Sequence, residues 1–490
     1  MKQWMSALAL LCAVSFVGLT GCDWRPQFSQ EEINDPELGK NFPKGFLFGA
    51  ATSAYQIEGS MDNDWTEWEQ QKNKEGQWYV KPSNDPRCSK VGEPCSGKAA
   101  DSWNRWQEDI KLLEELGANS YRLGIEWSRL EPKEGQFDDA AFNRYREMLK
   151  ALRAKNITPM VTLYHFTLPK WFADKGRWEE DKNPKALFYF ERFAAEAAKR
   201  LGDQVDLWAT INEPNVYAFE GYLFGEWPPG IQGNMQMATK VLATLLKAHG
   251  VSARAIRKHD TTDIDGDGKG AQVGIVHHVR IAQPSSSFAI DHMISGLTDD
   301  FFNESIVRAV TTGKIYLMVP GDITIDEDYE PLKGSSDFLG INYYTRDHIR
   351  TDFGDPSLSK QYFAKSSTKN DLGWDIYAGG LYRTLMRFSR YKLPIYITEN
   401  GTADDKDAFR PAFMKAHLTA MQRAIEHGAD IRGYFHWSLM DNFEWAIGYN
   451  AFFGLFKIDP ATQNRIPRKE SVTVFQNIAR NMGLNPQPRD

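Results

Sequence analysis

Two glutamates, Glu213 and Glu399, stand where apolar, strand-like runs end. Glu213 follows the run Trp-Ala-Thr-Ile-Asn at 208–212, and Glu399 follows Ile-Tyr-Ile-Thr at 395–398. Cleavage of a glycosidic bond needs two facing carboxyl groups, because one protonates the leaving oxygen while the other attacks or stabilises the anomeric carbon. Either glutamate alone could be a solvent-exposed charge at a strand end, but the pair favours this chemistry.

The segments that must position these residues alternate between strand and helix patterns. Alternating β and α units imply parallel strands, and eight of them can close into a single α/β domain, a (β/α)8 TIM barrel with extended loops at the carboxyl face of its strands. An open doubly wound sheet is the alternative, but it needs a glycine-rich phosphate loop that 45–59 does not supply. The predicted strands are 45–51, 120–125, 158–163, 205–211, 272–277, 338–342, 394–398 and 433–437, and the predicted helices are 103–116, 139–155, 184–201, 235–258 and 408–427.

Composition excludes some classes of partner. The 490 residues are 42% hydrophobic and 25% charged, with a formal net charge of −7 and no basic cluster, so a nucleic-acid partner is not expected. The N-terminal segment has one lysine, an apolar run at 7–17 and Leu-Thr-Gly-Cys at 19–22, an ending similar to a bacterial lipobox.

This pattern predicts a signal peptide at 1–21, lipid on Cys22, a polar tether at 22–40 and a catalytic domain at 41–490. We therefore expect an exported bacterial lipoprotein, anchored to a membrane through Cys22 and located in the periplasm or at the cell surface. An ordinary signal peptide with a chance cysteine is the alternative. Outside the leader, Cys88 and Cys95 lie close together in a polar loop, and in an oxidising compartment they predict a disulfide rather than a metal clip, since further ligands are lacking nearby.

One acidic loop has the spacing of a calcium site. Asp263, Asp265 and Asp267 occupy its first, third and fifth positions, and glycine occupies the sixth. The twelfth position is Gly274 where a calcium loop needs a bidentate glutamate, so a solvated turn is favoured and a structural calcium is the alternative. No other cofactor is expected.

Seven runs, in order, carry a resemblance to a known family. They include Phe-Gly-Ala-Ala-Thr-Ser-Ala-Tyr-Gln-Ile-Glu-Gly, Thr-Ile-Asn-Glu-Pro and Tyr-Ile-Thr-Glu-Asn-Gly, and their positions are 48–59, 121–129, 162–165, 210–214, 337–344, 396–401 and 437–445. From Phe42 to about Asp459 the chain resembles glycoside hydrolase family 1, the β-glucosidase and β-galactosidase family. The resemblance implies a (β/α)8 barrel and hydrolysis of β-linked sugars.

The resemblance also implies roles for single residues. Glu399 matches the family's nucleophile and Glu213 its acid/base, with Arg122, Tyr344 and Asn342 as their supporting partners. A cation and a phenol donor would keep Glu399 ionised, whereas like charge would keep Glu213 protonated. The residues that match sugar-binding positions are Gln56, His165, Asn212, Trp437, Glu444 and Trp445.

These matches predict a retaining exo-β-glycosidase that acts on glucosides, galactosides or short β-oligosaccharides by double displacement. A 6-phosphoglycosidase is disfavoured because Glu444 would repel phosphate, and an inactive sugar-binding module is disfavoured because both catalytic glutamates are present. The chain departs from the family at Phe166-Thr167, a change expected on the aglycone side. His277 and His278 could line that side or be ordinary rim residues, and the sequence favours neither.

Overall fold

The computed structural model describes residues 41–80, 85–88, 94–266, 268–354, 359–362 and 367–484. The predicted leader, Cys22 and the whole tether lie outside these ranges. Within them, no helix has the length and apolar character needed to cross a membrane.

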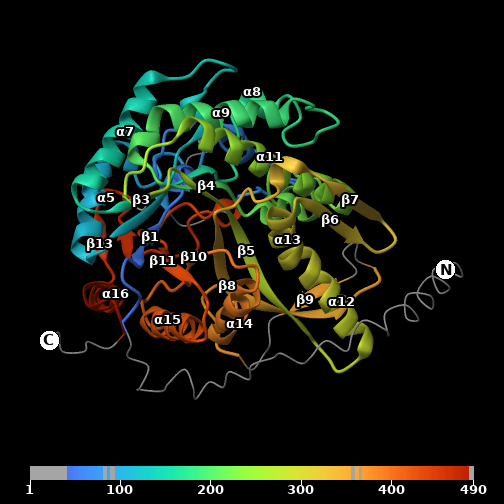
Figure 1. The fold of residues 1–490 in the computed structure, drawn as a ribbon. Coiled ribbons are helices and arrows are strands. Elements are labelled where there is room, and N and C mark those ends of the chain that lie inside the picture. Colours follow the sequence, from blue (N-terminus) through green and yellow to red (C-terminus); the bar gives the residue numbers. More distant parts are fainter. Residues whose placement is uncertain are drawn as a thin grey trace, which may run out of the picture.

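Eight parallel strands form a closed barrel, and helices surround it (Figure 1). Each strand pairs in parallel with its two neighbours, and β10 pairs with β8 to complete the ring. The predicted (β/α)8 barrel is therefore confirmed, and all eight predicted strands are present. The barrel strands are β1 (Leu47–Ala51), β2 (Ser120–Gly124), β3 (Thr158–Tyr164), β4 (Leu207–Asn212), β5 (Gln272–Pro284), β8 (Phe338–Thr351), β10 (Ile395–Asn400) and β11 (Ile431–Trp437).

The outer helices follow amphipathic patterns in the sequence. In α7, for example, Asp138 caps the N-terminus by accepting from the Ala141 N–H at 2.9 Å, and the buried positions recur every three or four residues. All five predicted helices are present. The longer helices are α5 (Ser102–Leu116), α7 (Asp139–Ala154), α9 (Ala186–Leu201), α11 (Met235–His259), α12 (Ala289–Asp299), α13 (Ser305–Thr312), α14 (Ala378–Ser389), α15 (Arg410–Glu426) and α16 (Lys469–Asn481).

Short elements decorate the loops, and several were not predicted. The short helices are α3 (Ala54–Ile57), α4 (Asp64–Trp68), α6 (Trp127–Leu130), α8 (Lys170–Ala173), α10 (Pro214–Phe219), η2 (Pro86–Cys88), η3 (Gly202–Gln204), η4 (Glu220–Phe224), η5 (Asp300–Glu304), η6 (Glu330–Leu332) and η7 (Trp445–Ile447). The strands outside the ring are β6 (Lys314–Val319), β7 (Ile323–Asp328), β9 (Ser359–Tyr362), β12 (Phe456–Ile458) and β13 (Arg465–Pro467).

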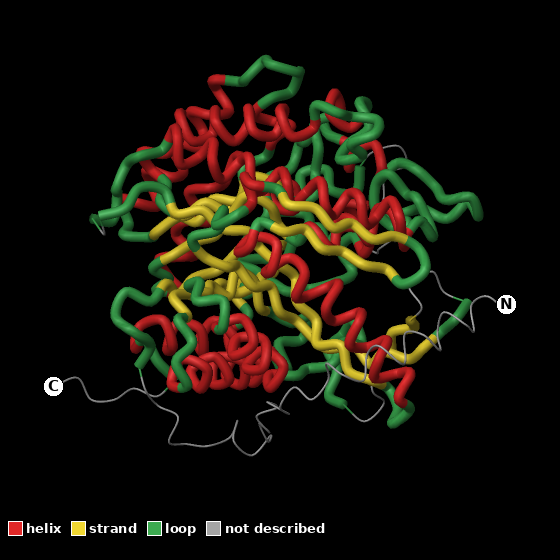
Figure 2. The backbone as a smooth tube through the Cα atoms, turned by 45° about the vertical axis from the view of Figure 1, so that its right-hand side comes forward, coloured by secondary structure: helices red, strands yellow, loops and turns green. Residues whose placement is uncertain are grey.

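Two barrel strands run far past the ring. β5 and β8 stay paired as far as Pro284 and Ile349, and β9 adds to β8 in the antiparallel direction. These strands, with α12 packed against β5 and β8, run outward from the barrel in Figure 2, and the β6–β7 hairpin forms a separate two-stranded sheet. This extension was not anticipated from the sequence, which predicted strands of ordinary length.

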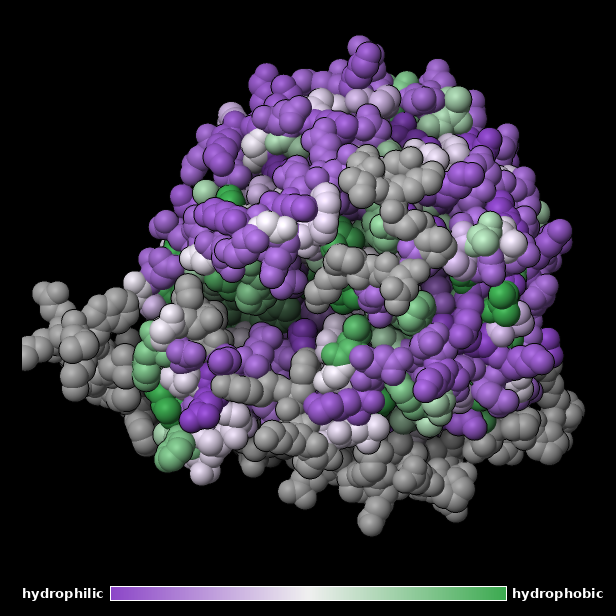
Figure 3. All heavy atoms as spheres, turned by 180° about the vertical axis from the view of Figure 1, so that it is seen from behind, coloured by the Kyte–Doolittle hydropathy of each residue, from purple (hydrophilic) through white to green (hydrophobic). Residues whose placement is uncertain are grey.

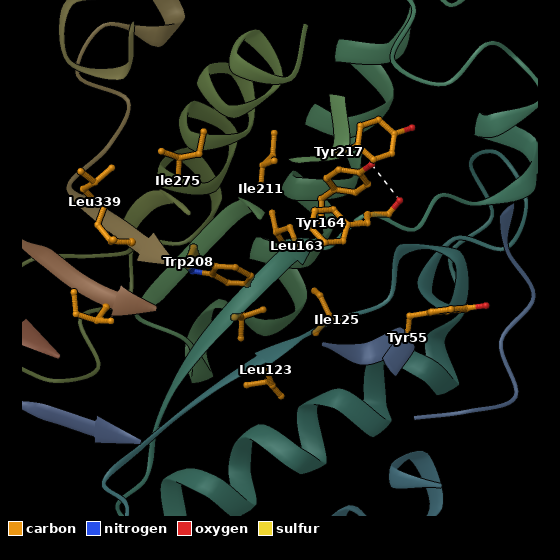
Figure 4. Packing of buried hydrophobic residues seen from close by; sticks show 14 of the residues in the cluster. Tyr55, Leu123, Ile125, Leu163, Tyr164, Trp208, Ile211, Tyr217, Ile275 and Leu339 are labelled. Carbon is orange, nitrogen blue, oxygen red and sulfur yellow. Dashed lines mark hydrogen bonds between the residues drawn. The ribbon is translucent and has the colours of Figure 1, made fainter. Parts of the chain in front are cut away.

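Apolar side chains pack in two layers. Residues such as Trp208 fill the space between the barrel and the helices, as the close-up in Figure 4 shows, whereas Leu207 and Ala209 of the same strand point into the barrel. The alternation follows from the two-residue period of a strand. On the face seen in Figure 3 the surface is mostly hydrophilic, with hydrophobic walls gathered in a hollow.

Two loops carry the residues for which the sequence suggested a disulfide and a calcium site. The structure joins Cys88 and Cys95 in the predicted disulfide, with their Cα atoms 4.3 Å apart. In the acidic loop, the Asp263 carboxylate accepts the N–H groups of Gly266 and Gly268 at 2.8 and 2.9 Å. Asp267 lies outside the described residues, among which no group of three acidic, histidine or cysteine side chains could hold a metal ion. The calcium interpretation therefore stays a prediction.

Candidate active site

A buried cavity lies at the carboxyl ends of the barrel strands, with about 1150 Å³ of empty space including its open mouth. Among the predicted site residues, its walls contain His165, Glu213, Tyr344, Glu399, Trp437, Glu444 and Trp445. The remaining four, Gln56, Arg122, Asn212 and Asn342, are fully buried and hydrogen-bonded to these. The structure thus brings together all eleven residues that the sequence proposed for catalysis and sugar binding.

Glu399 lies one residue before the end of β10 and has a hydrogen-bond donor on each carboxylate oxygen. Arg122 of β2 donates from a terminal guanidinium nitrogen to Oε1 at 2.6 Å, and the Tyr344 hydroxyl of β8 donates to Oε2 at 2.6 Å. All three side chains are at least nine-tenths buried. Two strong donors fix the orientation of the carboxylate and stabilise its charged form.

Glu213 sits in a strained turn between β4 and α10. Its backbone is left-handed, with φ 45° and ψ 61°, and Pro214 starts the helix immediately afterwards. Non-glycine residues in this conformation cost about 1–3 kcal/mol and gather at functional sites. The turn aims the carboxyl group at the cavity, where Oε1 contacts Asn342 Nδ2 at 2.8 Å and His278 Nδ1 at 2.9 Å.

Two asparagines connect the halves of the site. Asn212 Oδ1 accepts from Arg122 at 2.7 Å and from Asn342 Nδ2 at 3.1 Å, so its amide nitrogen faces His165 Nε2 at 3.1 Å. Asn342 Oδ1 accepts from the Thr398 hydroxyl at 2.7 Å, which turns its amide nitrogen toward Glu213. These bonds fix which end of each amide is the donor.

One end of the cavity carries polar atoms that the protein leaves unpaired. His165 Nδ1 and Glu444 Oε1 are buried without a hydrogen-bond partner among the described residues, and so is Oε1 of the adjacent Gln56. Since His165 Nε2 accepts from Asn212, its Nδ1 is a donor, and burial lowers its pKa well below the ordinary value. Trp437 and Trp445 lie beside His165, with ring centroids 5.9 and 6.0 Å away. Donors, acceptors and flat apolar rings together suit a sugar.

Comparison with known sequences now decides the family. Residues 38–484 match the sequence profile of glycosyl hydrolase family 1. The chain belongs to glycosyl hydrolase family 1. It is 31% identical over 515 residues to "Beta-galactosidase" from Pyrococcus woesei, which spans 90% of this chain and 98% of the relative. It is 33% identical over 464 residues to "Beta-glucosidase A" from Thermotoga maritima, with 91% and 99% covered.

Solved structures agree. The fold is similar to "beta-glycosidase from Pyrococcus horikoshii", with a TM-score of 0.78, 37% identity, and 91% of this chain and 96% of that chain covered. As a member of family 1, the chain is a glycoside hydrolase that acts on β-glycosides.

The opposite end of the cavity is lined mainly by apolar aromatic rings, although Glu220, Glu226 and Arg280 also line the cavity. Phe219, Phe224 and Phe302 line it and also line a neighbouring pocket of about 700 Å³, whose outer wall includes Leu297 of α12. These rings sit on or beside η4 and η5, which are turns of π-helix. π-helical turns are rare and often mark functional sites. The residue periodicity of the sequence does not reveal these π-helical turns. The sequence therefore did not predict this part of the cavity.

Two further details correct the sequence interpretation. Phe166 was expected to affect only the aglycone side, but its ring lies 4.8 Å from His165 and 5.2 Å from Trp445, between centroids, at the polar end. The two histidines that end the predicted fifth strand differ. His277 is fully buried and its Nε2 contacts the Asn303 carbonyl oxygen at 2.9 Å, whereas His278 reaches the cavity and Glu213.

The surroundings of the two carboxyl groups shift their pKa values in opposite directions. Burial raises the pKa of Glu399 to about 7, and the like charge of Glu213 adds to this, although Arg122 and Tyr344 oppose it. Burial raises the pKa of Glu213 as well, but positive charge on His278, its hydrogen bond and Asn342 outweigh burial and hold this pKa below the ordinary value. The charge on the His278 imidazole decides this balance, so the expectation that Glu213 keeps the proton stays a prediction. A neutral imidazole removes the main cause of the lowered pKa of Glu213.

Proposed function

We propose that the chain is a retaining exo-β-glycosidase that hydrolyses β-glucosides, β-galactosides or short β-oligosaccharides by double displacement. The observation that carries the proposal is the pair of buried carboxyl groups in one cavity with different partners. Glu399 has a donor on each oxygen, which suits a nucleophile that must be charged. Glu213 has both of its donors on Oε1, which leaves Oε2 for the substrate.

In the first step, a Glu399 oxygen attacks the anomeric carbon while the bond to the aglycone oxygen breaks. Glu213 gives its proton to that oxygen, so the aglycone leaves as a neutral alcohol or phenol. The sugar is then an ester of Glu399. Esterification removes the negative charge of Glu399, and with it the repulsion that raises the proton affinity of Glu213.

In the second step, Glu213 takes a proton from water as the water oxygen attacks the anomeric carbon and the ester bond to Glu399 breaks. Two inversions restore the β-configuration. Arg122 and Tyr344 stabilise Glu399 again as it leaves with its negative charge.

The polar end of the cavity supports an unphosphorylated terminal sugar. Burial raises the pKa of Glu444 to about 8, and its unpaired Oε1 is available to a sugar hydroxyl. A phosphate at that place would meet a carboxyl group instead of a cation, so its charge would be buried without a counter-ion. This supports plain glycosides over 6-phosphoglycosides as substrates.

The direct test is to identify the first-formed sugar by proton NMR, using chromogenic β-glycosides with and without a 6-phosphate group. The proposal expects hydrolysis of at least one unphosphorylated β-glycoside, with the β-anomer appearing first and mutarotating later. An α-anomer appearing first would refute double displacement, and activity confined to phosphorylated substrates would refute the assignment of Glu444.

We further propose that the enzyme is exported and carries lipid on Cys22. The support is the leader pattern and its Leu-Thr-Gly-Cys ending at 19–22. Labelled palmitate should enter the wild-type protein in a bacterial host and should not enter Cys22→Ser. Wild-type protein without label would contradict lipidation at this residue.

A further inference from the structure

His278 is a cavity residue to which the family resemblance assigned no role. It stands on β5, and its side chain is 10% exposed. Nδ1 lies 2.9 Å from Oε1 of Glu213. Its ring is held in place by Tyr344, whose centroid is 5.9 Å away in a stacked orientation, and by the edge of Phe302 at 6.0 Å. Asn215 of α10 donates to its backbone carbonyl at 3.0 Å.

The partners of Glu213 define what His278 does. Asn342 Nδ2 donates to Oε1, because the Thr398 hydroxyl occupies the other end of that amide. His278 Nδ1 points at the same oxygen. When Nδ1 carries its hydrogen, Oε1 accepts two bonds and behaves as a carbonyl-type oxygen. The proton of the neutral acid then belongs on Oε2.

We propose that His278 is a positioning residue for the acid/base: its Nδ1–H, together with Asn342, holds Oε1 of Glu213 and leaves Oε2 to carry the proton that the leaving oxygen receives. The inference rests on the proposed role of Glu213. His278 keeps its own proton throughout, since the proton transferred moves from Oε2 to the aglycone oxygen as the glycosidic bond breaks. The residue acts through Glu213 and not on the sugar.

Other titratable or charged groups share the cavity and must be weighed in any pH effect. They are His165, Glu213, Glu220, Glu226, Arg280, Tyr344, Glu399 and Glu444. Arg280 is paired with Asp347 at 2.6 Å, and the Tyr344 hydroxyl is bound to Glu399. Glu213 is the carboxyl that His278 contacts directly, and the contact lowers its pKa. Loss of His278 should therefore raise that pKa.

The first test compares aryl β-glycosides whose phenols differ in acidity. In His278→Phe, kcat/KM for the unsubstituted phenyl glycoside should fall about 10–100-fold, because this leaving group needs protonation. For the dinitrophenyl glycoside, which needs little protonation, it should fall less than about threefold. His278→Asn retains an amide donor and should stay within about threefold of wild type for both. His292→Phe, on the exposed face of α12, is the matched control.

The second test is the pH profile of kcat/KM, whose basic limb reports loss of the proton from Glu213 in the free enzyme. His278→Phe should move this limb to higher pH. An equal loss for every leaving group, or a basic limb that stays or moves down, would show a merely structural residue and overturn the inference while the proposed function stands. A wild-type protein that hydrolyses no β-glycoside would instead overturn the proposed function itself.

Discussion

The two ends of the cavity are built on different principles. At the polar end, His165, Glu444 and Gln56 offer buried atoms that have no partner among the described residues, and each side chain is oriented by at least one further hydrogen bond. At the apolar end, aromatic rings on or beside π-helical turns form most of the wall, with Glu220, Glu226 and Arg280 as the charged groups that also line the cavity. A polar site rejects a ligand that leaves its groups unpaired, whereas an apolar wall discriminates weakly. This enzyme should therefore be strict about the terminal sugar and tolerant of the aglycone.

Apart from the two catalytic glutamates themselves, the largest effect should come from Arg122, which supports the polar end and the nucleophile together. Arg122→Met removes the ion pair to Glu399 and the bond to Asn212, and it leaves the buried Glu399 carboxylate with the Tyr344 hydroxyl but without a cation. We expect kcat/KM to fall about 10²–10³-fold for every leaving group. Arg254→Met, on the exposed face of α11, should change little. A loss for poor leaving groups alone would show that Arg122 serves Glu213 instead.

The next effect distinguishes plain glucosides from 6-phosphoglucosides as substrates. Glu444→Ser removes the unpaired carboxyl oxygen, so kcat/KM for plain glucosides should fall about 10–100-fold. Activity on 6-phosphoglucosides should rise relative to plain glucosides, since the carboxyl group no longer occupies the place of the phosphate. A variant that keeps the wild-type preference between the two substrates would show that Glu444 does not face that end of the sugar.

The sequence predicted the polar end better than the apolar end, because the two ends are built from different kinds of element. Glu213, Glu399 and the sugar-binding residues sit at strand ends within fixed motifs, and a closed parallel barrel must bring strand ends together. The contact between His278 and Glu213 depends instead on how far β5 continues past the ring. Phe302 lies on a π-helical turn. The extra residue of such a turn breaks the α-helical period from which helices are predicted in a sequence.

A smaller effect should appear with alkyl β-glucosides of increasing chain length. If the pocket beyond Phe219 accepts an apolar aglycone, each methylene should raise wild-type kcat/KM by about two- to fourfold until the pocket is filled. Leu297→Asp should lower the ratio of octyl to methyl glucoside activity about tenfold and leave methyl glucoside unchanged. Leu187→Asp on α9 is the matched control. Equal loss for both substrates would mean that Leu297 only supports the fold.

The smallest expected effect is on the thermal stability of the protein, because the polar end buries the titratable carboxyl group of Glu444. Burial raises the pKa of Glu444 to about 8, so the folded state favours the neutral acid. The stability that this group contributes is fully present below its unfolded pKa of about 4.5 and is lost as pH rises through 8. The side chain of the Glu444→Gln variant does not titrate. The difference obtained by subtracting the Tm of wild type from the Tm of this variant should therefore increase by about 1–2 °C between pH 5 and pH 8.5. A constant difference would contradict a buried, neutral Glu444.

The most direct test of the central claim, that Glu399 attacks the sugar and Glu213 moves the proton, is to identify azide products from two variants. Glu399→Ala should lose nearly all hydrolysis with every leaving group, and any azide product should be the α-glycosyl azide, because azide occupies the vacated nucleophile side. Glu213→Ala should still react with an acidic phenol glycoside, accumulate the glycosyl-enzyme and release the β-glycosyl azide, because azide needs no general base. The opposite pairing of products and variants would exchange the two roles, and full activity in both variants would contradict catalysis at this site.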